Sequence, residues 1–154
     1  MTLPQFDDSK EFETFHNVDG VQIIKINTND SAKYVQKMKD CYEELKPFID
    51  EKGYQKVIHV YFKAPPLSAI LSFIEVPLPY VFVWSAVAII EPEDSVVEKF
   101  NPIINWAARL NKNKERVITR IYDHSYLQKV DEVKSWLDDQ IARGPGGIRR
   151  GRKR

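Results

Sequence analysis

The sequence predicts one α/β domain built on a central, mostly parallel sheet. Short segments rich in β-branched and aromatic residues alternate with longer segments whose apolar residues recur every three or four positions. The chain has 154 residues, 43% of them apolar, a size and composition typical of a single globular domain. A single cysteine, Cys41, excludes a disulfide-based fold and indicates a reducing compartment.

The chain is expected to open with a β-hairpin. Apolar and polar residues alternate in 12–15 and 21–26, on either side of Asn17-Val18-Asp19-Gly20. The Asp-Gly pair suits the left-handed backbone of a tight turn, so these two segments are predicted to pair as antiparallel strands.

An amphipathic helix is expected from Ser31 to about Asp50, capped by Asp30 or Ser31. Pro47 would remove a backbone hydrogen bond in its last turn, so the helix is expected to kink or end early there. The predicted apolar face consists of Tyr34, Val35, Met38, Cys41, Tyr42, Leu45, Phe48 and Ile49.

Strands and helices continue to alternate in the rest of the chain. Ser95 and Ser125 are each followed three residues later by glutamate or glutamine, the spacing of a capping box that begins a helix. The predicted strands are 57–62, 81–90 and 116–122, and the predicted helices are 67–73, one from Ser95 to about Leu110, and one from Ser125 that ends before Gly144.

The long apolar stretch from Ala64 to Ile90 contains one charged residue, Glu75. Four prolines at positions 65, 66, 77 and 79 divide it, which favours a short helix and a buried strand over a membrane span. The first residues are acidic and lack the apolar run of a signal peptide, so a cytoplasmic location is expected.

Charge is distributed unevenly along the chain. Residues 1–143 contain 18 basic and 22 acidic residues, and residues 144–154 contain five basic residues and no acid. We therefore predict a domain over 1–143 and a flexible basic tail over 144–154, whose glycines and proline disfavour a helix. Weak contact with nucleic acid or an anionic surface is expected of its cations, unless the tail is merely a solubilising end: Arg149, Arg150, Arg152, Lys153 and Arg154.

Three segments carry a resemblance to a known family: Ser85-Ala86-Val87-Ala88-Ile89-Ile90, the run Val117-Ile118-Thr119-Arg120-Ile121-Tyr122-Asp123, and Val133-Lys134-Ser135-Trp136-Leu137. The order of a strand, a helix, a strand ending in an aromatic residue, and a helix ending in Trp-Leu resembles the SpoIIAA-like family. That family is similar to STAS domains and, distantly, to lipid-binding Sec14 domains. Over residues 12–142, the resemblance implies a STAS-like fold with about five strands and four helices.

The resemblance also implies candidate sites. Signalling STAS domains are phosphorylated on a serine beside an aspartate, and the nearest position here is Ser68, which has no such aspartate and would otherwise simply cap a short helix. The Sec14 likeness implies an apolar ligand such as a lipid in a pocket lined by Leu67, Leu71, Phe73 and Tyr80.

No catalytic or metal-binding motif is found in the sequence. The three histidines show no metal-ligand spacing; His59 is expected as a hydrogen-bonded core residue and His124 as an exposed loop residue. Cys41 lies on an apolar helix face, where a thiol is usually inert. We therefore expect no enzyme activity, no metal and no cofactor. The expected function is a binding or regulatory module for a protein partner, with a lipid carrier and a nucleic-acid or ribosome-associated protein as alternatives.

Overall fold

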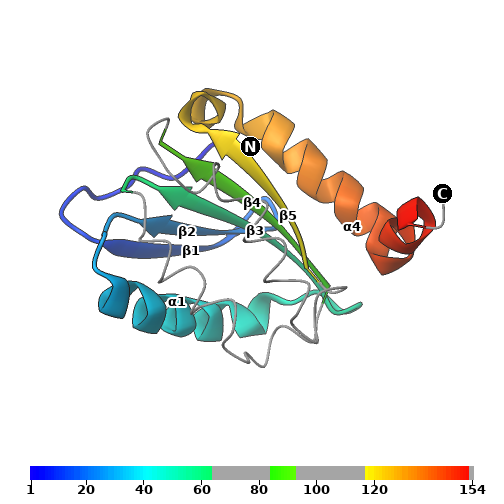
Figure 1. Cartoon of the computed structure of the whole chain (residues 1–154), viewed down its shortest axis with the longest axis horizontal. Coiled ribbons are helices and arrows are strands. Elements are labelled where there is room, and N and C mark those ends of the chain that lie inside the picture. The colour runs from blue at the N-terminus through cyan, green and yellow to red at the C-terminus, as the bar shows by residue number, and fades with distance from the viewer. Residues whose placement is uncertain (64–83, 93–116, 153–154) are drawn as a thin grey trace.

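The computed structural model describes residues 1–63, 84–92 and 117–152. These form a five-stranded sheet with helix α1 on one face and helix α4 on the other (Figure 1). The α/β class is thereby confirmed. Of the four predicted helices, the first and the last are present. The helix at 67–73, the helix from Ser95 and the first part of the strand at 81–90 lie outside the described residues.

The predicted hairpin is present. Strand β1 (Phe12–Val18) pairs antiparallel with β2 (Val21–Ile26), and the register shifts between Phe15 and Val18. Asp19 and Gly20 have φ values of 51° and 81°, in the left-handed region that the tight turn requires. The Asp-Gly pair therefore has the role that its sequence predicts.

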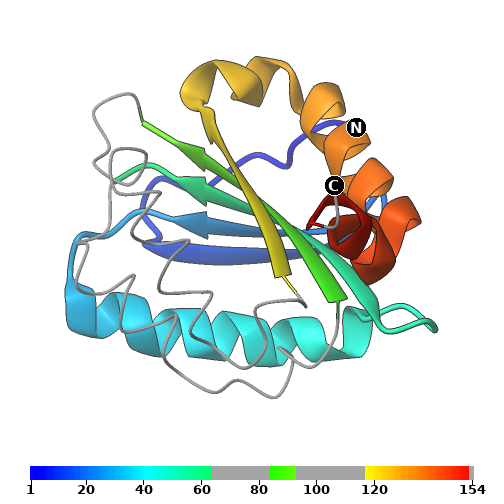
Figure 2. The same ribbon diagram turned by 45° about the vertical axis from the view of Figure 1, so that its right-hand side comes forward.

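The remaining strands are all parallel to β2. They are β3 (Tyr54–Tyr61), β4 (Trp84–Glu91) and β5 (Val117–Asp123), and the order across the sheet is the order along the chain. The mostly parallel five-stranded sheet is thus confirmed. Figure 2 shows its twist and the opposite placement of the two helices.

Helix α1 covers Ser31–Leu45, and the Asp30 carboxylate accepts a hydrogen bond from the Lys33 backbone N–H at 3.0 Å. The helix ends early, as Pro47 predicts, and is followed by a single 3₁₀ turn, η1 (Lys46–Phe48). Because the chain leaves the helical path here, Phe48 is 38% exposed and not part of the buried face.

The predicted start of the last helix is wrong. Asp123, not Ser125, caps this region: its carboxylate accepts a hydrogen bond from the Ser125 backbone N–H at 2.8 Å and begins a 3₁₀ turn, η3 (His124–Gln128). Helix α4 begins only at Val130. The aspartate lies at the end of β5, where its oxygen reaches the first free amides before the serine can.

Helix α4 spans Val130–Arg152 and is interrupted at Gly144, whose φ of 62° and ψ of −173° are not helical. The interruption agrees with a helix end at this position. However, the backbone then becomes helical again as far as Arg152, whereas the glycines and proline of the tail predict no helix.

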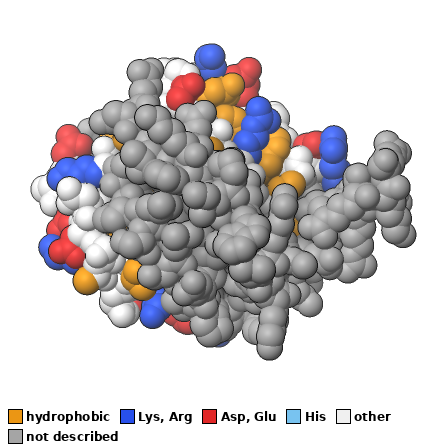
Figure 3. All heavy atoms as spheres, in the orientation of Figure 1, with side chains coloured by type: hydrophobic (Ala, Val, Ile, Leu, Met, Phe, Trp, Pro, Cys, Tyr) orange, Lys and Arg blue, Asp and Glu red, His pale blue; other side chains and the backbone are white. Residues whose placement is uncertain are grey.

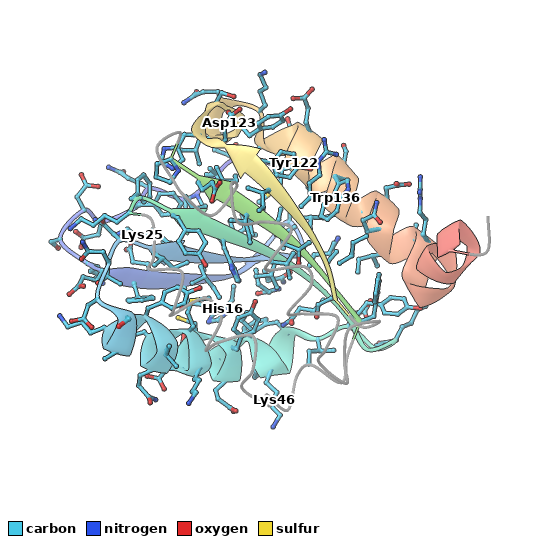
Figure 4. The ribbon with its side chains drawn as sticks, in the orientation of Figure 1. His16, Lys25, Lys46, Tyr122, Asp123 and Trp136 are labelled. Atoms are coloured by element: carbon cyan, nitrogen blue, oxygen red, sulfur yellow. The ribbon has the colours of Figure 1, made fainter. Side chains whose placement is uncertain are left out.

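Two apolar cores flank the sheet, because successive strand residues face opposite sides. The core beneath α1 includes Ile24, Ile26, Met38, Leu45 and Val57, and the core beneath α4 includes Ile23, Ile58, Val60, Ala88 and Leu137. Tyr122 of β5 and Trp136 of α4 meet edge-on at the margin of the second core, with ring centroids 6.4 Å apart (Figure 4).

An ion-pair network attaches α4 to the sheet. The Asp138 carboxylate lies 2.6 Å from Lys56 Nζ of β3 and 2.9 Å from Lys134 Nζ of α4. Partial burial raises the pKa of Asp138, but the hydrogen bonds from Lys56 and Lys134 lower it by more. None of the helices in the described parts combines the length and the apolar character that a bilayer crossing needs.

Candidate functional site

A buried cluster of three tyrosines and one histidine lies between α1 and β3. Tyr34 and Tyr42 are eight residues apart on the helix, and His59 and Tyr61 are two apart on the strand, so each pair shares a face. The Tyr34 and Tyr61 hydroxyl oxygens are 2.8 Å apart, and the Tyr42 hydroxyl lies 2.8 Å from His59 Nε2. These four residues are called the tyrosine–histidine cluster below.

Burial keeps the tyrosine–histidine cluster neutral. It lowers the pKa of His59 to about 3 and raises the pKa of Tyr34 to about 12, and it raises the pKa of Tyr42 and of Tyr61 well above the usual tyrosine value. An imidazole with such a low pKa takes up no proton near neutral pH, whereas a general base works best with a pKa near the working pH. The cluster therefore supplies neutral hydrogen-bonding groups.

The carboxyl end of the sheet adds one buried acid, Glu91, which is 2% exposed. It is the last residue of β4 and pairs in register with Asp123 of β5. Sequence reasoning places Glu91 after the strand, among acids that favour the helix start that follows. The structure instead includes it in the sheet, where it contributes to the raised pKa of Tyr61.

The order of the described strands does not create a crevice at this edge. In open α/β sheets, ligands bind beyond the carboxyl ends of the strands where the strand order reverses. Here β2 to β5 follow one another without reversal. An open pocket of about 480 Å³ lies elsewhere, between residues 1–3 and residues 127–132, where the N-terminal ammonium is 2.6 Å from Asp131.

Lys25 is a fully buried cation that sequence reasoning missed. Its Nζ donates hydrogen bonds to the backbone carbonyls of Asp7, at 2.6 Å, and Lys10, and lies 3.5 Å from the Glu13 carboxylate (Figure 4). The signal was present, because Lys25 shares strand parity with the core residues Val21 and Ile23. Its contacts attach the N-terminal segment to the sheet.

The other candidate side chains agree with expectation only in part. The buried, hydrogen-bonded His59 is confirmed. Cys41 is also buried; its thiol accepts a hydrogen bond from Thr14 Oγ1 at 3.4 Å, and burial raises its pKa. The exposed position predicted for His124 is wrong, because its ring is partly buried and lies with Nε2 2.7 Å from the Tyr61 carbonyl oxygen.

The predicted regulatory and ligand residues lie outside the described part of the chain: Ser68, Leu67, Leu71, Phe73 and Tyr80. Of the tail cations, Arg149, Arg150 and Arg152 belong to the helical backbone that follows Gly144. No group of three histidine, cysteine or acidic side chains within the described ranges is suited to a metal ion.

Compared with known proteins, the chain matches no family model, no curated protein and no solved structure. The SpoIIAA-like resemblance therefore remains an interpretation of the residues that carry it.

Proposed function

We propose that this chain is a non-catalytic binding or regulatory module of the STAS-like type, which acts through contacts with a protein partner. The observation that carries the proposal is the open edge of the sheet at β1. The chemistry of the interior supports it, because the His59 imidazole and the Cys41 thiol are buried and have pKa values displaced away from the neutral form of a base and the thiolate form of a nucleophile.

The β1 edge offers backbone groups for a partner. β1 pairs with β2 on one side, and no described strand lies on its other side. Six of its seven residues are partly exposed, and the seventh, Asn17, is fully exposed. An edge strand of this kind accepts an added strand from another chain, with main-chain hydrogen bonds supplying affinity.

An aromatic pair lies beside this edge. The ring of Phe48 stacks on the ring of His16 with centroids 4.3 Å apart and an interplanar angle of 6°, and the Glu44 carboxylate lies 3.7 Å from His16 Nε2. We call His16, Glu44 and Phe48 the edge patch; Figure 4 shows His16 close to the end of α1. An exposed aromatic side chain within a polar rim is typical of the centre of a protein interface.

The experiment compares three forms of the full chain: wild type, the edge variant His16→Ser/Phe48→Ser, and a matched control, Lys10→Ser/Lys37→Ser, at two exposed positions away from the patch. Each is used for affinity capture from the native cell, followed by titration with the purified captured protein. We expect a partner that wild type and control retain and the edge variant binds about 30-fold more weakly, which corresponds to about 2 kcal/mol.

Thermal melts of all three forms would show that the variants remain folded. The same set of captured proteins with the edge variant as with wild type would contradict the proposal. A co-purified lipid in native mass spectrometry, without any patch-dependent protein, would favour the carrier alternative instead.

A further inference from the structure

The charge pattern of α4 changes at Gly144. Before it, the cations have acidic neighbours: Lys134 Nζ is 2.9 Å from the Asp138 carboxylate, and Arg143 Nη2 is 3.1 Å from the Asp139 carboxylate. After it, the chain contains five basic residues and no acid. The terminal cations therefore have no acidic partner in their own segment.

The backbone at Gly144 separates these two parts of the helix. Its φ of 62° and ψ of −173° lie in a region that essentially only glycine adopts, so the helix axis changes direction there. Figure 1 shows the terminal turns bending away from the axis of the preceding helix, at the margin of the molecule. The helical backbone to Arg152 thus holds the basic residues together at one end of the fold.

We propose that this segment, residues 145–154, is a binding site for the phosphate backbone of single-stranded nucleic acid. Four of its five cations are arginines, whose planar guanidinium donates two parallel hydrogen bonds to a phosphate. Positions 149 and 152 are three residues apart on a helix and therefore neighbours on one face. Like charges at that spacing repel each other, and a polyanion would relieve the repulsion.

The rest of the molecule explains why the contact is confined to this end. Residues 1–143 carry a net charge of −4, and where described side chains are visible in Figure 3, basic and acidic ones are interspersed. The body therefore offers a polyanion no continuous basic surface, and its net charge repels one. A flexible single strand avoids this repulsion because it can contact the tail alone.

An anionic membrane fits the segment less well. Its apolar residues are Pro145 and Ile148, with no aromatic residue, so it lacks the apolar face of a helix that lies in a membrane interface. The helical part, residues 145–152, would be about 12 Å long. That is little more than the Debye length of about 8 Å, so a flat anionic surface would also meet the negative body. Arginine stacks on unpaired bases in addition to binding phosphate, which favours a single strand.

The test is fluorescence anisotropy of the full chain with a labelled oligouridine of about 20 nucleotides, from about 50 to 200 mM salt. Because a single strand loses about 0.7 in log–log slope per phosphate contact, five contacts predict a slope of about −3.5 for the association constant against salt. The variant Arg149→Gln/Arg150→Gln/Arg152→Gln is expected to bind at least about tenfold more weakly at the lowest salt, with a slope of about −1.4.

A control variant removes the same charge elsewhere. Lys37, Lys46 and Lys52 are exposed on and after α1, and changing all three to Gln lowers the formal net charge from +1 to −2, as the arginine variant does. Binding within about twofold of wild type is expected of this control. The edge variant His16→Ser/Phe48→Ser should also retain full RNA binding, so that failure of this site and failure of the edge patch are distinguished.

Three results would overturn the proposal: no binding of the full chain to the oligonucleotide at about 50 mM salt, equal loss in the arginine variant and the lysine control, or binding to phosphatidylserine vesicles without binding to RNA. The last result would identify a membrane as the partner.

Discussion

The Tyr42 hydroxyl lies 2.8 Å from His59 Nε2, and both side chains are buried between α1 and β3. This contact connects the middle of the helix to the middle of the sheet. Burial lowers the pKa of His59 to about 3, so the imidazole is neutral over most of the pH range in which proteins fold. The contact therefore acts on stability, and it makes that stability dependent on pH.

Replacing Tyr42→Phe should lower the free energy of unfolding by about 1–3 kcal/mol, because the His59 ring nitrogen loses a hydrogen-bond partner in the interior. Urea denaturation measures the loss. In a double-mutant cycle with His59→Leu, the combined loss should fall short of the sum by at least about 0.5 kcal/mol. Tyr126→Phe with His59→Leu is the control, since Tyr126 lies in η3 and contacts the other core, and should be additive. Additivity in the Tyr42 cycle would show that the pair is not coupled.

Stability should fall as the pH is lowered, because of His59. Its pKa is about 3 in the folded chain and 6.5 at its ordinary value. Between these values the unfolded chain binds more protons, so this contribution is fully present above about pH 6.5 and is lost as the pH falls toward 3. From pH 7 to pH 5 the loss should be about 2 kcal/mol. The His59→Leu variant keeps all carboxylates and should lack this component; parallel pH profiles of the two chains would exclude it.

Replacing Lys25→Met should release the N-terminal segment. Methionine occupies the buried space but leaves the Asp7 and Lys10 carbonyls without their donor, at about 1–3 kcal/mol for each unsatisfied buried group. Faster hydrogen exchange and faster proteolysis within residues 1–11 are expected, measured by mass spectrometry. Lys33→Met removes an exposed ion pair with Glu11 and serves as the control, with little expected change. Unchanged protection of residues 1–11 in Lys25→Met would disprove the tether.

Replacing Gly144→Ala should strain α4. An alanine at φ 62° and ψ −173° costs about 1–3 kcal/mol, and its Cβ would lie 3.4 Å from the Tyr54 hydroxyl oxygen. The melting temperature is expected to fall, or the bend to straighten and the distance from the chain end to the sheet to change, which a fluorophore pair would report. A variant with an unchanged melting temperature and an unchanged distance would contradict the interruption at this residue.

Local patterns in the sequence predicted the regular elements well. Asp19-Gly20 identified the hairpin, Asp30 identified the start of α1, and Pro47 identified its early end, because turn and cap preferences depend on neighbouring residues only. The start of α4 was mispredicted, because Asp123 and Ser125 both have side chains that can cap a helix. Only the path of the chain at the end of β5 places the aspartate at the free amides.

By itself, the sequence determined the α/β class, the hairpin, the helical face of Tyr34 and Tyr42, and the separation of charge at residue 144. These follow from spacing and composition. Only the tertiary structure decided that Tyr42 meets His59, that Lys25 is buried beneath the Asp7 and Lys10 carbonyls, and that Phe48 is exposed beside His16. Each of these depends on which distant segments the folded chain brings together, and local residue preferences contain no information on that.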